Sequence, residues 1–164
     1  MRRLILFFFF VSAAFAAEDW GPLKFLVGNW IGEGTGKPGE ATGGFSFLPD
    51  LQGAVLVRRN FAEYPAQAGK PASRHDDLMV AYREESSHQL RATYYDSEGH
   101  VISYAISQSD KGAIFTSEGR KEELRYRLTY APAGADKLTI RFEIAPPGKA
   151  FATYIEATAR RSVN

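Results

Sequence analysis

Two consecutive arginines, Arg58 and Arg59, follow a run of four apolar residues in a stretch that has the composition of a β-strand. Side chains alternate between the two faces of a strand, so one of these arginines must point inward. A buried guanidinium requires an anionic partner, which is either a protein carboxylate, such as Asp96 or Glu143, or an anionic ligand. The pattern does not decide between the two arginines. We treat both, with the adjacent Asn60, as candidate ligand-binding residues.

A histidine followed by two aspartates, His75-Asp76-Asp77, begins a second strand after a long loop. Such a histidine can serve at a cavity mouth as a general base or a metal ligand, because its pKa lies near neutrality. The alternative is ordinary hydrogen bonding at a strand edge, with an aspartate capping the turn. A metal site needs three or four converging ligands, and only this cluster is visible, so we predict no metal site. His88 and His100 lie in turns and are predicted to be exposed to solvent.

Several tyrosines lie in segments predicted to be central strands. Tyrosines line many ligand cavities, because each presents an apolar ring and one hydroxyl group that can hydrogen-bond. They also fill ordinary barrel cores, and the sequence leaves both interpretations open. The four candidates for the interior are Tyr82, Tyr94, Tyr104 and Tyr126.

Motifs of known catalytic machinery are absent from the sequence. The stretch at residues 44–48, Gly-Phe-Ser-Phe-Leu, lacks the final glycine of a nucleophile elbow, and there is no P-loop, dinucleotide fingerprint or H-E-x-x-H motif. The chain has no cysteine, which excludes thiolate nucleophiles, zinc–cysteine sites and iron–sulfur ligation. We therefore assign no catalytic residue, although the sequence does not exclude an enzyme.

The N-terminal residues predict export. Arg2 and Arg3 precede an apolar run at residues 4–11, and residues 14–16 form an A-x-A cleavage pattern, which together are typical of a signal peptide. The apolar run is shorter than the roughly 20 residues that a spanning helix needs. We predict cleavage of residues 1–16, which leaves residues 17–164 as one domain, periplasmic or secreted, without a membrane span.

The charge of the predicted mature chain argues against nucleic acid as a partner. Removal of the two leader arginines lowers the formal net charge from +1 to −1. Binding to phosphates needs a clustered cationic surface, which such a chain lacks. The expected partner is a small molecule, and the pattern does not indicate an oligomeric state.

The elements that must position these residues are mainly strands. Apolar spacing and Pro22 predict one short helix at residues 20–27, and from Asn29 onward apolar residues alternate with polar ones. Short connections between about ten such strands predict a single antiparallel up-and-down β-barrel, with a sandwich as the alternative. The loop at residues 65–73 is long enough to be a lid. The predicted strands are 29–36, 41–48, 53–62, 77–84, 89–96, 100–108, 112–119, 123–131, 136–145 and 150–161.

The last predicted strand has its apolar residues at every second position. Phe151, Thr153, Ile155, Ala157 and Ala159 are therefore predicted to share one face. One apolar and one polar face per strand indicate a sheet that contacts water on one side only.

The most specific string in the chain is G-x-W-x-G-x-G at residues 28–34, directly after the predicted helix. Its G-x-W core resembles the opening of the first strand in calycin barrels, which include lipocalins and fatty-acid-binding proteins. The resemblance implies that Trp30 plugs the barrel floor and that an arginine of the last strand, here Arg161, lies against its ring. The roles implied for Gly28, Trp30 and Arg161 are structural.

The longer form of the string resembles nitrobindin-like haem proteins and related lipocalin-like proteins of unknown function (the DUF1579 type). Nitrobindin-like proteins hold haem iron through a histidine near the C-terminal end of the barrel. The last histidine of this chain is His100, so no residue matches that ligand. The resemblance therefore points to the lipocalin-like relatives, and we expect no haem and no other cofactor.

Taken together, these features predict an exported barrel that binds a small hydrophobic or amphipathic molecule, with an anionic ligand as one option. Two alternatives stay open. One is an enzyme that acts on a molecule held in the same cavity, with His75 as acid or base. The other is a structural envelope protein whose barrel is packed solid and holds no ligand.

Overall fold

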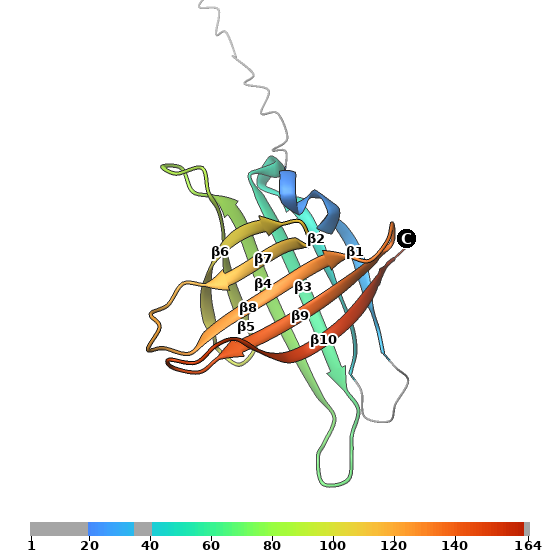
Figure 1. Cartoon of the computed structure of the whole chain (residues 1–164). Helices are drawn as coiled ribbons and strands as arrows, with labels where there is room; N and C mark the ends of the chain where they lie inside the picture. The colour runs from blue at the N-terminus through green and yellow to red at the C-terminus, as the bar shows by residue number, and fades with distance from the viewer. Residues whose placement is uncertain (1–19, 35–40, 163–164) are drawn as a thin grey trace, which may run out of the picture.

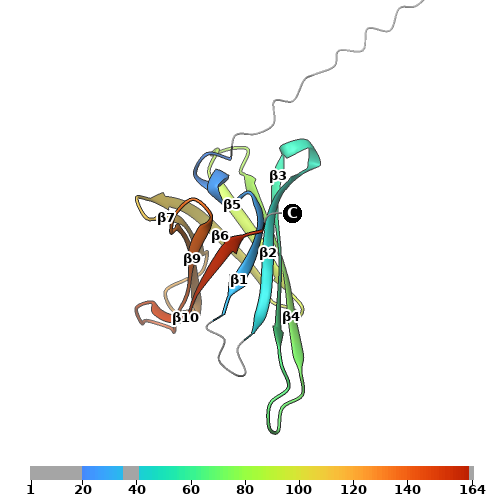
Figure 2. The ribbon, with the colours of Figure 1, turned by 90° about the vertical axis from the view of Figure 1, so that its right-hand side faces the viewer.

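The computed structural model describes residues 20–34 and 41–162 and places them in one closed barrel (Figures 1 and 2). The predicted signal peptide, its cleavage site and the end of the predicted strand 29–36 lie outside the described residues. Within these ranges the fold is all-β, apart from two short 3-10 turns, η1 (Gly21–Leu26) and η2 (Leu51–Gly53). The helix expected at residues 20–27 is therefore a 3-10 helix.

Ten antiparallel strands make up the barrel in the described part of the chain, as predicted. Each strand pairs with its neighbours in the sequence, and β1 pairs with β10 to close the sheet. This confirms the up-and-down barrel and excludes the sandwich. Closure leaves no unpaired edge along the sheet. The strands are β1 (Gly28–Glu33), β2 (Thr42–Asp50), β3 (Val55–Tyr64), β4 (Ser73–Arg83), β5 (Leu90–Asp96), β6 (Val101–Ser109), β7 (Gly112–Ser117), β8 (Arg125–Pro132), β9 (Lys137–Ala145) and β10 (Ala152–Arg161).

Figure 1 shows η1 at one end of the barrel. Its buried side chains belong to the same core cluster as several aromatic rings from the strands. Leu23 and Leu26 of η1 are fully buried. Beside them the ring of Phe47 lies 5.5 Å from that of Tyr130, which in turn lies 5.8 Å from the ring of Phe115. These edge-on contacts bury large apolar surfaces, which stabilises this half of the barrel. The interior is therefore packed solid only at this end.

The structure places Arg161 of β10 directly over Trp30 of β1. The guanidinium carbon lies 4.3 Å from the ring centroid, and Nη1 donates to the carbonyl of Val27 at 2.7 Å. The indole Nε1 of Trp30 donates to the carbonyl of Leu26 at 2.8 Å. Gly28 has a φ of +129°, and a Cβ there would lie 2.6 Å from Nη1 of Arg161. The strand opening thus needs glycine both for its backbone conformation and for the arginine beside it.

The last strand differs from its prediction at a β-bulge. The pairing of β10 with β9 shifts between Thr153 and Ile155, so one extra residue enters β10 there. Such a bulge reverses the faces to which the preceding residues point. Phe151 packs instead against Arg127, whose guanidinium carbon lies 4.4 Å from its ring on the outer face. The prediction that Phe151 shares a face with Ile155 is therefore wrong.

The expected lid is a continuation of the β3–β4 hairpin. Gln67 and Lys70 exchange backbone hydrogen bonds of 3.0 and 2.9 Å, which close a tight turn. Figures 1 and 2 show this hairpin projecting beyond the barrel at the end opposite η1. None of residues 65–72 lines the interior cavity described below. Strand pairing persists further than the Pro- and Gly-containing sequence suggested, so the segment extends outward.

Candidate functional site

The half of the barrel away from the aromatic cluster encloses a cavity of about 580 Å³. This volume lies within the range of small-molecule sites, roughly 300–1,000 Å³. One side of the wall carries charged and amide groups from β3, β4, β5 and the β5–β6 turn, and the rest is aromatic and aliphatic. The apolar lining includes Phe45, Ile102, Tyr104, Tyr126, Leu128, Ile140, Phe142, Tyr154 and Ile155.

Arg58 is the arginine that points inward. It lines the cavity, its side chain is 10% exposed, and its guanidinium forms an ion pair with Asp77, which is 5% exposed. Burial alone would lower the pKa of Arg58, but Tyr130 and Asp77 raise it, so the guanidinium remains charged. The sequence suggested Asp96 or Glu143 as partners, whereas Asp77 of the neighbouring strand takes this role. β3 and β4 pair directly, which brings the two side chains together.

Asp77 is the centre of the polar wall. Asn60 Nδ2 donates to its Oδ2 at 2.8 Å, and His75 Nε2 lies 3.4 Å from the same oxygen. Both oxygens of this buried carboxylate therefore have partners: Arg58 contacts Oδ1, and Asn60 and His75 contact Oδ2. Burying a carboxylate costs free energy unless such a set of partners satisfies its oxygens.

His75 joins Asp77 to the cavity mouth. Its Nδ1 lies 3.0 Å from Glu98 Oε1, and its Nε2 lies 3.3 Å from the hydroxyl of Tyr94. Burial would lower the pKa of His75, but Glu98, Asp77 and Asp96 raise it overall. His75 therefore faces both a carboxylate and a hydroxyl, and these neighbours favour its protonated form relative to a free histidine.

Asp96 organises the turn between β5 and β6. Its side chain is 5% exposed, and its Oδ1 accepts the backbone N–H groups of Glu98 and His100 at 3.0 and 2.9 Å. The His100 ring Nδ1 lies 2.8 Å from Oδ2. Burial raises the pKa of Asp96, but these bonds outweigh it and lower the pKa, so the carboxylate remains ionised. His100 is exposed as predicted, yet it also lines the cavity mouth.

Three of the four candidate tyrosines line the cavity, and one does not. Tyr94, Tyr104 and Tyr126 face the interior. Burial, with Asp77 and Asp96 nearby, raises the pKa of Tyr94 well above its usual range, so its hydroxyl stays protonated. Tyr82 is 37% exposed and points outward. The prediction for Tyr82 is wrong, because on β4 the inward positions are the odd-numbered ones.

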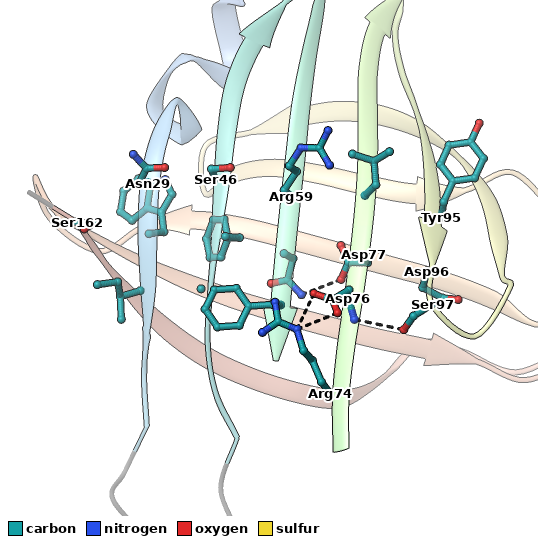
Figure 3. A pocket seen from close by; sticks show the side chains of 17 residues that line it. Asn29, Ser46, Arg59, Arg74, Asp76, Asp77, Tyr95, Asp96, Ser97 and Ser162 are labelled. Atoms are coloured by element: carbon teal, nitrogen blue, oxygen red, sulfur yellow. Dashed lines mark hydrogen bonds and ion pairs between the residues drawn. The ribbon is translucent and has the colours of Figure 1, made fainter. Parts of the chain in front are cut away.

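Arg59 points outward into a shallow groove across the outer faces of β1–β5, about 820 Å³ in volume (Figure 3). Arg74 and Asp76 form an ion pair in this groove, with side chains 50% and 53% exposed. Exposed pairs contribute little and are screened by salt. Figure 3 shows Arg59 standing apart from that pair. The inner cavity, with its buried charges, is the stronger candidate site, and Arg59 is not part of it.

Among the described residues, one group could bring three metal ligands together: Asp96, Glu98 and His100, all from the β5–β6 turn. Two of the three are largely exposed, and their close contacts are hydrogen bonds of the turn itself. A haem ligand at the position implied by the nitrobindin resemblance has no counterpart here. His75 lies on β4, and His88 and His100 lie in turns, so none of the three histidines is on β8, β9 or β10.

Sequence reasoning did not assign four residues of the polar wall to ligand binding: Asp77, Asp96, Glu98 and His100. Asp77 was considered only as part of the cluster with His75, and Asp96 only as a possible partner of an arginine. The alternation held a usable signal, since Asp77 shares its face with the buried Met79. Glu98 and His100 gave no such signal, because turn residues have no fixed parity.

No known protein-family model matches the chain, and no curated protein is significantly similar to it. Within the described residues, no helix has the length and apolar character needed to cross a membrane.

Proposed function

We propose that this protein is an exported, calycin-like binding protein that holds a small amphipathic molecule in its barrel. The observation that carries this proposal is the division of the interior. One end is filled by aromatic side chains, and the other holds a cavity of about 580 Å³ with apolar walls and one polar side. Ligand sites combine an apolar lining with a few fixed polar groups in this way.

The calycin-like assignment is supported by the G-x-W string and by the contact of Arg161 with Trp30, which this resemblance implies. The anionic ligand considered from the sequence has less support, because Asp77 already neutralises Arg58. An amphipathic ligand would place its apolar part against residues such as Phe142 and Ile140, and its polar part near His75. Fold alone does not define function, so the proposal depends on the cavity.

Native mass spectrometry tests the proposal directly. The untagged chain is purified from an exporting host, and its native mass is compared with its denatured mass. We expect a reproducible excess that is released on denaturation. Ala157→Phe, which fills the cavity from β10, should abolish the excess, whereas Ala131→Phe on β8, outside the cavity, should keep it. A bare native mass that persists after incubation with amphipathic compounds would refute the proposal.

One observation favours a second candidate, an enzyme that acts on the bound molecule. His75 lies within 3.0 Å of Glu98 and 3.3 Å of the Tyr94 hydroxyl, the geometry of a general acid or base held by a carboxylate. The test is to incubate the released ligand with wild type and with His75→Gln, and to compare its mass and chromatographic retention. A change that requires His75 would support catalysis, and an unchanged ligand with both proteins would leave binding as the function.

A further inference from the structure

The charges around the cavity indicate what kind of polar group a ligand would carry. Among the described lining residues, Arg58 is the single lysine or arginine, and it is paired with Asp77. Two further carboxylates, Asp96 and Glu98, line the mouth. The side chains bonded to them are His75, His100 and the hydroxyl of Tyr94, none of which is a lysine or an arginine. Counted over arginine and carboxylate side chains alone, the described lining residues carry a formal net charge of −2, from Arg58 against Asp77, Asp96 and Glu98. An anionic ligand would therefore meet repulsion at the mouth.

The apolar wall adds an independent argument. The rings of Tyr126 and Phe142 are stacked with their centroids 5.9 Å apart, and Tyr154 lies edge-on to Phe142 at 6.3 Å. All three line the same cavity. Aromatic faces attract organic cations as well as apolar chains, because the ring quadrupole places negative charge on the face. A cavity that contains both an aromatic wall and two carboxylates thus suits a molecule with both an apolar chain and a positive charge.

We infer that the ligand class is a cationic amphiphile, an amine with an apolar tail, whose ammonium group lies between Asp96 and Glu98. This inference rests on the proposed binding function and specifies the ligand of that cavity. Asp96 is the stronger of the two partners, since it is 5% exposed whereas Glu98 is 59% exposed. A charged hydrogen bond to a buried carboxylate is stronger than one at the surface.

The test uses three probes that share a ten-carbon tail: decylamine, decanol and decanoate. Their dissociation constants are measured by titration calorimetry at pH 8, below their micelle concentrations, on the untagged protein. We expect decylamine to bind about tenfold or more tightly than decanol, which is the factor that one charged hydrogen bond adds, and decanoate to bind most weakly. The decanol value measures the apolar contribution alone.

Three variants test whether the carboxylates at the cavity mouth cause the tighter binding of decylamine. Asp96→Asn keeps the acceptor oxygen of the turn and should weaken decylamine binding about tenfold, and Glu98→Gln should weaken it about threefold. Both should weaken decanol binding less than decylamine binding, because decanol carries no charge. Glu122→Gln makes the same charge change on an exposed residue that does not line the cavity, so it should alter nothing.

The outcomes separate the two proposals. If decanol or decanoate binds as tightly as decylamine, the cationic class is wrong and the binding function stands. Equal loss of decylamine binding in Glu122→Gln would also refute the class, since the attraction would then be a general surface effect. If none of the three probes binds, both the ligand class and the proposed binding function fail.

Discussion

The buried pair of Arg58 and Asp77 offers the most demanding test of this interior. Removing one partner of a buried ion pair costs about 3–5 kcal/mol, because the other charge stays buried without compensation. The two single substitutions should differ, since the remaining partners differ. Asp77→Asn leaves a guanidinium that is 10% exposed without a counter-charge, and its Nε already has no hydrogen-bond acceptor. We expect this variant to lose about 3–5 kcal/mol of unfolding free energy.

Arg58→Met should cost less. Asp77 would keep the hydrogen bond from Asn60 at 2.8 Å and its contact with His75 at 3.4 Å. We expect a loss of about 1–3 kcal/mol, the cost of a partly satisfied buried acceptor. In the double variant no charge is left without a partner, so adding Arg58→Met to Asp77→Asn should restore about 2 kcal/mol rather than remove more.

The assay is urea unfolding at pH 7, followed by tryptophan fluorescence and far-UV circular dichroism. Trp20 and Trp30 are 4% and 2% exposed, so their emission should shift on unfolding. For a chain of this length, a loss of 3–5 kcal/mol lowers the melting temperature by on the order of 10 °C. Asp76→Asn, which changes the exposed Asp76–Arg74 pair, should leave the midpoint unchanged. Additive losses in the double variant would refute the argument.

Two further predictions concern the start of β1 and the histidine at the cavity mouth. Gly28→Ala should lower the unfolding free energy by about 1–3 kcal/mol more than Gly134→Ala. The two glycines have similar φ values, +129° and +125°, but a Cβ at Gly28 would meet Arg161 whereas nothing lies within 4 Å of one at Gly134. Equal losses would show that the arginine simply moves aside. The pKa of His75 is raised in the folded state, so its contribution to stability is complete below its usual value of 6.5 and is lost as pH rises through the folded pKa. We therefore expect the difference in unfolding free energy between wild type and His75→Gln to be largest at acidic pH and to fall toward pH 8. Urea titrations across this range measure the difference. A difference that is independent of pH would contradict the raised pKa.

The class of fold could be predicted from the sequence. Period-two alternation, regular turn signals and short connections indicated an all-β chain of about ten strands and favoured a meander over a sandwich. Each predicted strand matches an observed one to within a few residues. Boundaries shifted where strand pairing continued through unfavourable residues, as in β4, which begins at Ser73 rather than at residue 77. The physical reason is that alternation is a local property, whereas a strand ends where its neighbour stops pairing.

The candidate site was predictable in part. Alternation marked Tyr94, Tyr104 and Tyr126 as interior residues, and the apolar context marked one of two arginines. It failed for Tyr82, because the face that points inward is known only once the register with neighbouring strands is fixed. A slip of one residue in the register exchanges the two faces of a strand. Alternation within a strand therefore predicts which residues share a face, but it does not predict whether that face points inward or outward.

The pairing of the charged side chains depends on the register between strands and could not be predicted from the sequence. Register between β3 and β4 sets Arg58 beside Asp77, and the turn after β5 brings Glu98 to His75, 23 positions earlier in the chain. The bulge in β10 likewise turned Phe151 outward, against the alternation of the sequence. The alternation of apolar and polar residues indicates which residues share a face, because side chains alternate along an extended backbone. The partners of a buried charge depend instead on how distant segments align, and closing the barrel fixes that alignment.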